Sequence, residues 1–189
     1  MKRSEVNAAI RHAAEFLEAN GWSLPPSPQW DVTDFGLDNF LQEGQVGIIL
    51  ANEPEYCEKL VFVTKSQRTP LHYHQHKKKD IVCRNGSLAI QVWPGLSDAA
   101  APVPIEVHLN NQRQTVLAGQ NIHLASGERL TLLPGWYHSF YPESDKCLFS
   151  EISTGNDDQH DIFFLNAAVI RFPEVEEDEP AIAKLVCDQ

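Results

Sequence analysis

Three histidines are the residues of this chain whose types and spacing best suit chemistry. His72 and His74 stand two apart in TPLHYH (69–74), and His138 follows a Pro-Gly turn in PGWYHSF (134–140). Residues i and i+2 of a strand face the same side, so the first two imidazoles can converge on one ion. A neighbouring strand would bring His138 beside them. The sequence therefore predicts a metal site with these three histidines as nitrogen ligands.

The glycines and turns around these histidines follow a specific order. The pair is followed by a turn ending in Gly86, and Gly127 and the Pro-Gly turn precede His138. This order resembles the two cupin motifs, and it implies a mainly β fold: a single cupin, jelly-roll-like β-barrel. An HxH pair alone would fit two partly exposed histidines on any strand. The third histidine in this order favours the metal site.

Position 79 departs from the first cupin motif. The motif normally supplies a metal-binding glutamate at this point, and the chain has Lys79. We expect one of three arrangements. Lys79 turns to solvent and leaves three histidines with open positions, which suits a catalytic site; Asp80 or His76 takes the vacant position; or the pocket is reused without a metal.

From about residue 45 the chain changes to short apolar or alternating runs separated by turn residues. The runs span 46–50, 60–64, 88–93, 104–109, 114–117, 122–124, 130–133 and 147–152. Many short strands with turn signals at this spacing indicate an antiparallel sandwich or barrel. We expect one domain over 1–189, with a helix and extended arm (1–44), the barrel (45–172) and an acidic tail (173–189).

The two ends of the chain predict elements outside the barrel. Ser4 can cap a helix over 5–19, whose apolar residues recur at intervals of three and four. We expect this helix to pack against the outside of the barrel. The acidic run within 174–179 predicts a solvated face or a fraying terminus.

The composition favours small neutral molecules and cations as partners. The net charge is −11, from 26 Asp+Glu against 15 Lys+Arg. Such a surface repels phosphate backbones and anionic membranes, so we expect neither nucleic-acid nor membrane binding. The four cysteines form no CxxC pair, which predicts reduced and mostly buried thiols. The N-terminal residues show no apolar signal-peptide core, which predicts a cytoplasmic protein.

Seven segments spread along nearly the whole chain are informative together. They are MKRSEVNAAI (1–10), WDVTDFGL (30–37), YCEKLVFV (56–63), TPLHYH (69–74), G-E-x-x-T-L-x-P-G-x-Y-H-S-F (127–140), NDDQ (156–159) and RFPEVEEDEP (171–180). In this order they resemble the D-lyxose isomerase family of cupins. The resemblance implies isomerisation of an aldose such as D-lyxose to its ketose, D-xylulose. It also implies a divalent metal, typically manganese, and a homodimer.

By position, the resemblance implies roles for single residues. His72, His74 and His138 match the family's metal histidines. Lys77 matches a lysine proposed to assist proton transfer, and Glu174 matches a glutamate proposed as its partner. A lysine acts as a base only when its pKa falls, and a nearby cation lowers it. On its own, the basic run HKKK would predict a surface loop.

Two other functions stay open at this point. A non-catalytic cupin could bind a sugar without a metal, with Lys79 in the ion's place. A cupin oxygenase would use three histidines and iron. Lys79, and the loss of an arginine and a glutamate from the segment 161–166, separate this chain from the family pattern. We favour the isomerase because WDVTDFGL and RFPEVEEDEP match that family rather than cupins at large.

Overall fold

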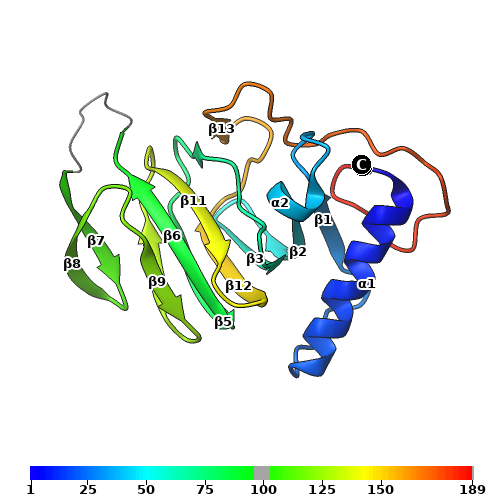
Figure 1. The fold of residues 1–189 in the computed structure, drawn as a ribbon, viewed down its shortest axis with the longest axis horizontal. Helices are drawn as coiled ribbons and strands as arrows, with labels where there is room; N and C mark the ends of the chain where they lie inside the picture. The colour runs from blue at the N-terminus through cyan, green and yellow to red at the C-terminus, as the bar shows by residue number, and fades with distance from the viewer. Residues whose placement is uncertain (96–102, 189) are drawn as a thin grey trace.

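Two antiparallel β-sheets and one long helix dominate the described part of the chain (Figure 1). The computed structural model describes residues 1–95 and 103–188. The elements in chain order are α1 (Arg3–Ala19), β1 (Gln29–Thr33), α2 (Phe40–Glu43), β2 (Gln45–Asn52), β3 (Tyr56–Thr64), β4 (His72–Tyr73), β5 (Lys79–Asn85), β6 (Ser87–Trp93), β7 (Pro104–Leu109), β8 (Gln112–Leu117), β9 (Ile122–Ala125), β10 (Arg129–Leu132), β11 (Tyr137–Pro142), β12 (Lys146–Thr154) and β13 (Phe163–Phe164).

The strand order is that of a jelly-roll-like sandwich. The larger sheet runs β1-β2-β3-β12-β5-β10-β7-β8, and the smaller runs β13-β4-β11-β6-β9. Strands far apart in sequence lie side by side, as where β12 pairs with both β3 and β5. The predicted mainly β, jelly-roll-like fold with an N-terminal helix outside it is confirmed.

Two strands of the larger sheet lie where the sequence predicted none. β1 extends the sheet from within the segment expected as an extended arm, and it pairs with β2. β5 begins at Lys79, inside the basic run expected as a loop. The start of this strand was missed because a lysine is not expected to face the inside of a sheet. The carboxylate that neutralises Lys79 lies on another strand and cannot be identified from the local pattern.

Alternation along each strand divides the apolar residues between two cores. Val61 and Val63 of β3 face the space between the sheets, whereas Leu60 and Phe62 face outward onto α1. Each fully buried side chain of this size contributes about 1.5–3 kcal/mol of hydrophobic stabilisation. Because the period is two, a slip of one residue would exchange the two sets, so the register is firmly specified.

Gly86 closes the hairpin between β5 and β6. Its φ is +88°, and a Cβ at this position would lie 2.5 Å from the carbonyl oxygen of Lys146. Both the positive φ and the close approach require glycine. The glycine of the first motif therefore holds β5, and with it Lys79, against β12.

Helix α1 covers the outer face of the larger sheet. It buries Val6, Ile10, Ala13 and Leu17 against β1, β2 and β3. The predicted Ser4 cap is wrong, because the helix begins at Arg3 with Lys2 as its N-cap residue. None of the helices within residues 1–95 and 103–188 is both long and apolar enough to cross a membrane.

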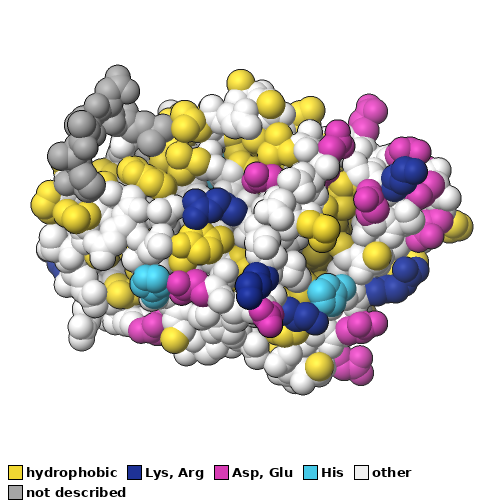
Figure 2. Space-filling model, in the orientation of Figure 1, with side chains coloured by type: hydrophobic (Ala, Val, Ile, Leu, Met, Phe, Trp, Pro, Cys, Tyr) yellow, Lys and Arg dark blue, Asp and Glu magenta, His cyan; other side chains and the backbone are white. Residues whose placement is uncertain are grey.

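The acidic tail is tied to the start of α1 rather than frayed. The Ser4 amide and hydroxyl donate to the Asp178 carboxylate at 2.8 and 2.7 Å, so the tail supplies the acceptor that capping requires. Arg3 donates to Glu177 through two nitrogens. Figure 2 shows acidic side chains gathered over this end of the molecule, with basic ones among them. The carboxylates are mostly exposed, as expected, yet they fasten the terminus.

The four cysteines are free thiols. Cys57, Cys83 and Cys147 are buried, and Cys187 is exposed. The prediction of mostly buried, unpaired thiols is confirmed.

Asn7→Ala tests the attachment of the tail. The Asn7 side chain is buried, donates to Glu179 and to the carbonyl of Pro180, and accepts the Ile182 amide. Its loss should lower the free energy of unfolding by about 1–3 kcal/mol, measured by urea denaturation. The exposed Gln114→Ala serves as control and should change stability by less than about 0.5 kcal/mol. Equal effects of the two substitutions would show that the tail adds nothing to stability.

Candidate active site

The three predicted histidines come together on the smaller sheet. His72 of β4 lies directly opposite His138 of β11, and His74 follows immediately after β4. All three are buried, and one ring nitrogen from each lies within 4.8 Å of the others. β4 is held between β11 and β13, so its short length does not leave His72 free to turn.

In all three imidazoles the Nδ1 atom faces a backbone carbonyl, which fixes the orientation of the ring. The Nδ1 atoms lie 2.8 Å from Pro70 O for His72, 2.6 Å from Asp161 O for His74, and 2.9 Å from Trp136 O for His138. A carbonyl only accepts, so each Nδ1 carries the proton and each Nε2 keeps its lone pair. Histidine ligands of metals are commonly oriented in this way. The buried Nε2 of His138 has no hydrogen-bond partner within the described residues, which fits a ligand atom for a first-row divalent ion.

The histidines are neutral. Burial, reinforced by the ammonium of Lys79, lowers the pKa of His72 to about 3 and that of His74 further. Burial also holds the pKa of His138 well below its ordinary value. Their Nε2 atoms are therefore available as ligands or as hydrogen-bond acceptors across the physiological pH range.

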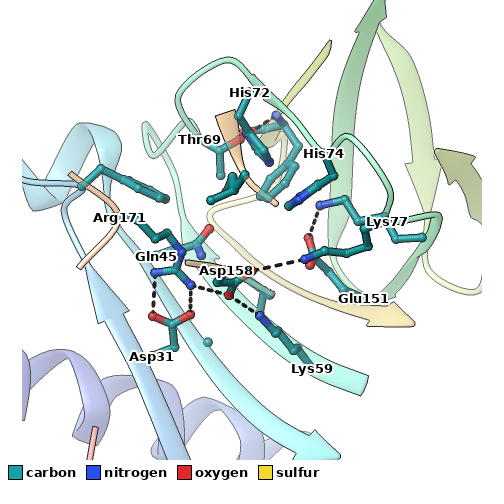
Figure 3. A pocket seen from close by; sticks show the side chains of 16 residues that line it. Asp31, Gln45, Lys59, Thr69, His72, His74, Lys77, Glu151, Asp158 and Arg171 are labelled. Atoms are coloured by element: carbon teal, nitrogen blue, oxygen red, sulfur yellow. Dashed lines mark hydrogen bonds and ion pairs between the residues drawn. The ribbon is translucent and has the colours of Figure 1, made fainter. Parts of the chain in front are cut away.

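Charged residues of the larger sheet face the histidines across the pocket. Lys59 shares the inner side of β3 with Val61, Lys79 shares that of β5 with Ile81, and Glu151 shares that of β12 with Phe149. The strand period therefore places all three at the open end of the apolar core (Figure 3).

Lys79 does not turn to solvent. Its side chain is 3% exposed, and its Nζ donates to Glu151 at 3.0 Å. The first expectation for position 79 is therefore wrong. The second is wrong as well: Asp80 accepts hydrogen bonds from Arg129 and Thr131 outside the pocket, and His76 is exposed. Lys79 occupies the pocket itself because a carboxylate on the next strand neutralises it.

The Lys79–Glu151 pair changes the electrostatics of the histidine site. Burial alone would raise the pKa of Glu151, but the ammonium groups of Lys79 and Lys77 hold it below its ordinary value. A unit charge about 4 Å from a divalent ion costs roughly 8 kcal/mol at an effective dielectric of about 20. The donor set of three histidines fits such an ion, and Lys79 opposes it.

Lys77 belongs to a second group of charges centred on Asp158. The Asp158 carboxylate accepts hydrogen bonds from Lys77 at 3.2 Å, Lys59 at 2.6 Å and Arg171 at 2.9 Å, as the dashed lines of Figure 3 show. Lys77 also donates to Asn156. Burial lowers the pKa of Lys77 to about 8, against the opposing effect of Asp158. Lys77 lines the same pocket as the histidines, so the structure places this predicted residue at the site.

Glu174 does not line this pocket, although its segment reaches it. Glu174 is exposed, whereas Arg171, three residues earlier, lies in the pocket and pairs with Asp31 and Asp158. Glu151, by contrast, lines the histidine pocket and accepts a hydrogen bond from Lys79.

Asp161 builds the loop that follows His74. Its carboxylate accepts the backbone amides of Gln75, His76 and Lys77, each at 2.9 Å, while its carbonyl orients His74. One residue thus fixes both a histidine ring and the start of the basic run. In the sequence it stood only as part of a segment that departs from the family pattern.

The free space of the pocket is small. The side chains leave a cavity of about 40 Å³. One water needs roughly 10–15 Å³ measured in this way, so the cavity holds a few waters rather than a sugar. Any sugar that binds here must displace side chains, and the long lysine and arginine side chains are the ones able to move.

Sequence reasoning missed Glu151, Asp158, Arg171 and Lys59. Two of them had a usable signal. Glu151 is the single charge within 147–154, and Lys59 is the single charge among the alternate residues 57, 59, 61 and 63, which indicates a paired or functional charge. Asp158 lies in the NDDQ segment and Arg171 in RFPE, and both segments were noted without a role for these residues.

Comparison with known proteins gives a consistent set of relatives. Residues 27–189 match the sequence family described as D-lyxose isomerase. A "D-lyxose/D-mannose isomerase" of Serratia proteamaculans is 37% identical, covering 95% of this chain and 94% of the relative. One of the same description from Escherichia coli O157:H7 is 34% identical, covering 96% and 95%. A "D-lyxose ketol-isomerase" of Cohnella laeviribosi is 30% identical, covering 95% and 100%.

Solved structures support the fold independently. L-ribose isomerase from Cellulomonas parahominis superposes with a TM-score of 0.65 at 17% identity, covering 89% of this chain and 94% of that one. At this identity the likeness concerns the fold alone.

Lys79→Glu tests the placement of position 79 beside the ion. Removing the opposing ammonium and adding a carboxylate should tighten manganese binding at least about tenfold, measured by titration calorimetry. The exposed neighbour Lys78→Glu makes the same charge change and should leave the affinity unaltered. An unchanged affinity in the Lys79 variant would remove that residue from the ion's surroundings.

Proposed function

The chain belongs to the D-lyxose isomerase family, and from this we propose that it is a ketol-isomerase that interconverts D-lyxose and D-xylulose. Relatives at 30–37% identity over nearly their full length support the reaction class. The observation that carries it is a buried pocket in which neutral histidines face an ionised glutamate and a lysine of lowered pKa. D-mannose, named with two of the relatives, is the related substrate we would test. A homodimer and a cytoplasmic location stay predictions from the sequence.

We assign the metal ligands to the Nε2 atoms of His72, His74 and His138, and we propose manganese as the ion. When bound, a divalent ion polarises the carbonyl of the sugar and stabilises negative charge on its oxygens. The protein's part is to hold the three rings neutral, which their burial does, and correctly turned, which the carbonyls of Pro70, Asp161 and Trp136 do. Three ligands leave positions open for sugar oxygens.

Glu151 is the base that we propose for the carbon-bound proton. Its side chain is 13% exposed and lines the pocket, and the neighbouring lysines hold its pKa below its ordinary value. It is therefore ionised and able to accept the proton from C2 of the open-chain aldose. Held away from bulk water, the same carboxyl group returns the proton to C1.

Lys77 is the residue that we propose for the proton between the oxygens. The amine accepts the proton of the O2 hydroxyl and delivers it to O1, which completes the change from aldose to ketose. Asn156 and Asp158 hold its Nζ at the edge of the pocket, and burial makes the neutral amine accessible near pH 8.

Conversion of D-lyxose to D-xylulose by the purified protein with added manganese tests the function directly. We expect turnover, and we expect Glu151→Gln to reduce it by about a hundredfold or more. Glu174→Gln is the matched comparison, since it makes the same change at the exposed glutamate and should leave turnover within about twofold. Loss of activity in the Glu174 variant alone would return the partner role to that residue. No turnover by the parent protein, with sugar still bound, would indicate a sugar-binding protein instead.

The pH dependence tests Lys77. Its lowered pKa of about 8 means that the neutral fraction increases as the pH rises through this value, while Glu151 stays ionised. Values of kcat/KM for D-lyxose should therefore rise between about pH 7 and 9. Lys77→Met should lower turnover and remove the rise of kcat/KM with pH. The exposed Lys78→Met should preserve both the turnover and the rise. A Lys77→Met profile that matches the parent would exclude Lys77 from the proton transfer.

A further inference from the structure

The buried ammonium of Lys79 has no part in the mechanism so far. It stands where the family resemblance expects a metal-binding carboxylate, and it contacts Glu151 at 3.0 Å. The inward residues that follow it on β5, Ile81 and Cys83, are apolar members of the core. Lys79 is thus the inner-face residue of β5 at the point where the apolar core gives way to the histidine pocket.

We propose that Lys79 is a catalytic residue whose ammonium polarises the carbonyl oxygen of the sugar, so that isomerisation also proceeds in protein stripped of divalent metal. The inference rests on the isomerase function proposed above and adds a second source of positive charge to the same pocket. Its ligand class is unchanged: an open-chain aldose presenting a carbonyl at C1 and a hydroxyl at C2.

The position of Lys79 matches the place where charge develops. Enolisation builds negative charge on O1 while the base removes the proton from C2, so a cation is needed within about 3 Å of O1 and close to the base. In the structure the ammonium lies directly against the Glu151 carboxylate. A sugar that enters between them places C2 toward the carboxylate and O1 toward the ammonium. Lys79 is buried and the Glu151 side chain is only 13% exposed, and in this setting a fixed positive charge acts more strongly than it does in water.

The ammonium of Lys79 keeps hydrogen-bonding capacity for this role, because it carries three donors and the bond to Glu151 uses one. The carbonyls of Pro70, Asp161 and Trp136 fix the protons of the three imidazoles on Nδ1, so each Nε2 lone pair can accept a hydrogen bond from a sugar hydroxyl. Lys77 is engaged by Asn156 and Asp158 rather than by Glu151 in this structure. Lys79 therefore is the cation that shares a hydrogen bond with the base.

The conversion of aldose to ketose balances in protons and electrons without a co-reactant. Glu151 takes the C2 proton, the C–H pair forms C1=C2, and the carbonyl pair moves to O1 beside the ammonium of Lys79. Lys77 takes the O2 proton and gives it to O1. C2=O2 then forms as the C1=C2 pair accepts the proton from Glu151 at C1. Lys79 stays protonated throughout, and each residue ends as it began.

Turnover by metal-stripped protein is the first test. The parent protein is treated with chelator, its metal content is checked by elemental analysis, and D-lyxose conversion is compared with a manganese-supplemented sample. We expect conversion to persist in the stripped parent and to fall by about a hundredfold in stripped Lys79→Gln. Stripped Lys79→Arg, which retains the charge, should keep part of it. The neighbouring exposed Lys78→Gln should behave as the parent.

Binding of a sugar hydroxamate, a planar mimic of the enediolate, gives a readout independent of turnover. In stripped protein, Lys79→Gln should weaken this binding about tenfold or more, since one charged hydrogen bond is lost. Circular dichroism and thermal melting establish that each variant is folded, and Lys79→Arg covers the case in which Lys79→Gln is not.

The outcomes separate the two proposals. Conversion that vanishes on stripping and returns with manganese, together with hydroxamate binding that Lys79→Gln leaves unchanged, would overturn the role of Lys79 and leave the isomerase standing. Absence of conversion by folded parent protein under both conditions would overturn both.

Discussion

The constraint on which this structure depends is that every charge buried between the sheets needs a partner. Lys59, Lys77, Lys79 and Arg171 line the pocket against three carboxylates, Asp31, Glu151 and Asp158. Removing an ion from water costs several kcal/mol even after relaxation, and only close opposite charges offset it. The pairs found here satisfy that requirement, with one cation in excess. That excess helps to keep the histidines neutral and to ionise Glu151.

The same constraint makes the pocket sensitive to strand register. Lys79 and Glu151 reach one another because β5 and β12 pair so that both side chains point between the sheets. A shift of either strand by one residue would turn one of the two charges to the opposite face. The tight turn at Gly86 and the inward apolar residues next to the two charges, Ile81 and Cys83 on β5 and Cys147 and Phe149 on β12, hold the register. The hydrophobic core therefore secures the geometry of the polar site.

The chain's last segment connects the pocket with the outside of the fold. Arg171 enters the pocket and joins β1, through Asp31, to Asp158. The residues that follow run to the start of α1, where Glu177 and Asp178 bind Arg3 and Ser4 (Figure 1). Contacts with residues near the N-terminus thus hold the last segment of the chain, which supplies Arg171 to the pocket. This explains physically why an acidic tail without a regular pattern is ordered.

The sequence by itself determined the fold class, the three histidines and the family, because those depend on local patterns. Alternation marks strands, HxH places two rings on one face, and motif order locates the third. It did not determine the environment of Lys79, nor the roles of Glu151, Asp158 and Arg171. Lys79 and Glu151 are 72 positions apart, and Arg171 and Asp31 are 140 apart. Whether a charge faces solvent or a buried partner depends on which strands become neighbours, and only the tertiary structure decides that.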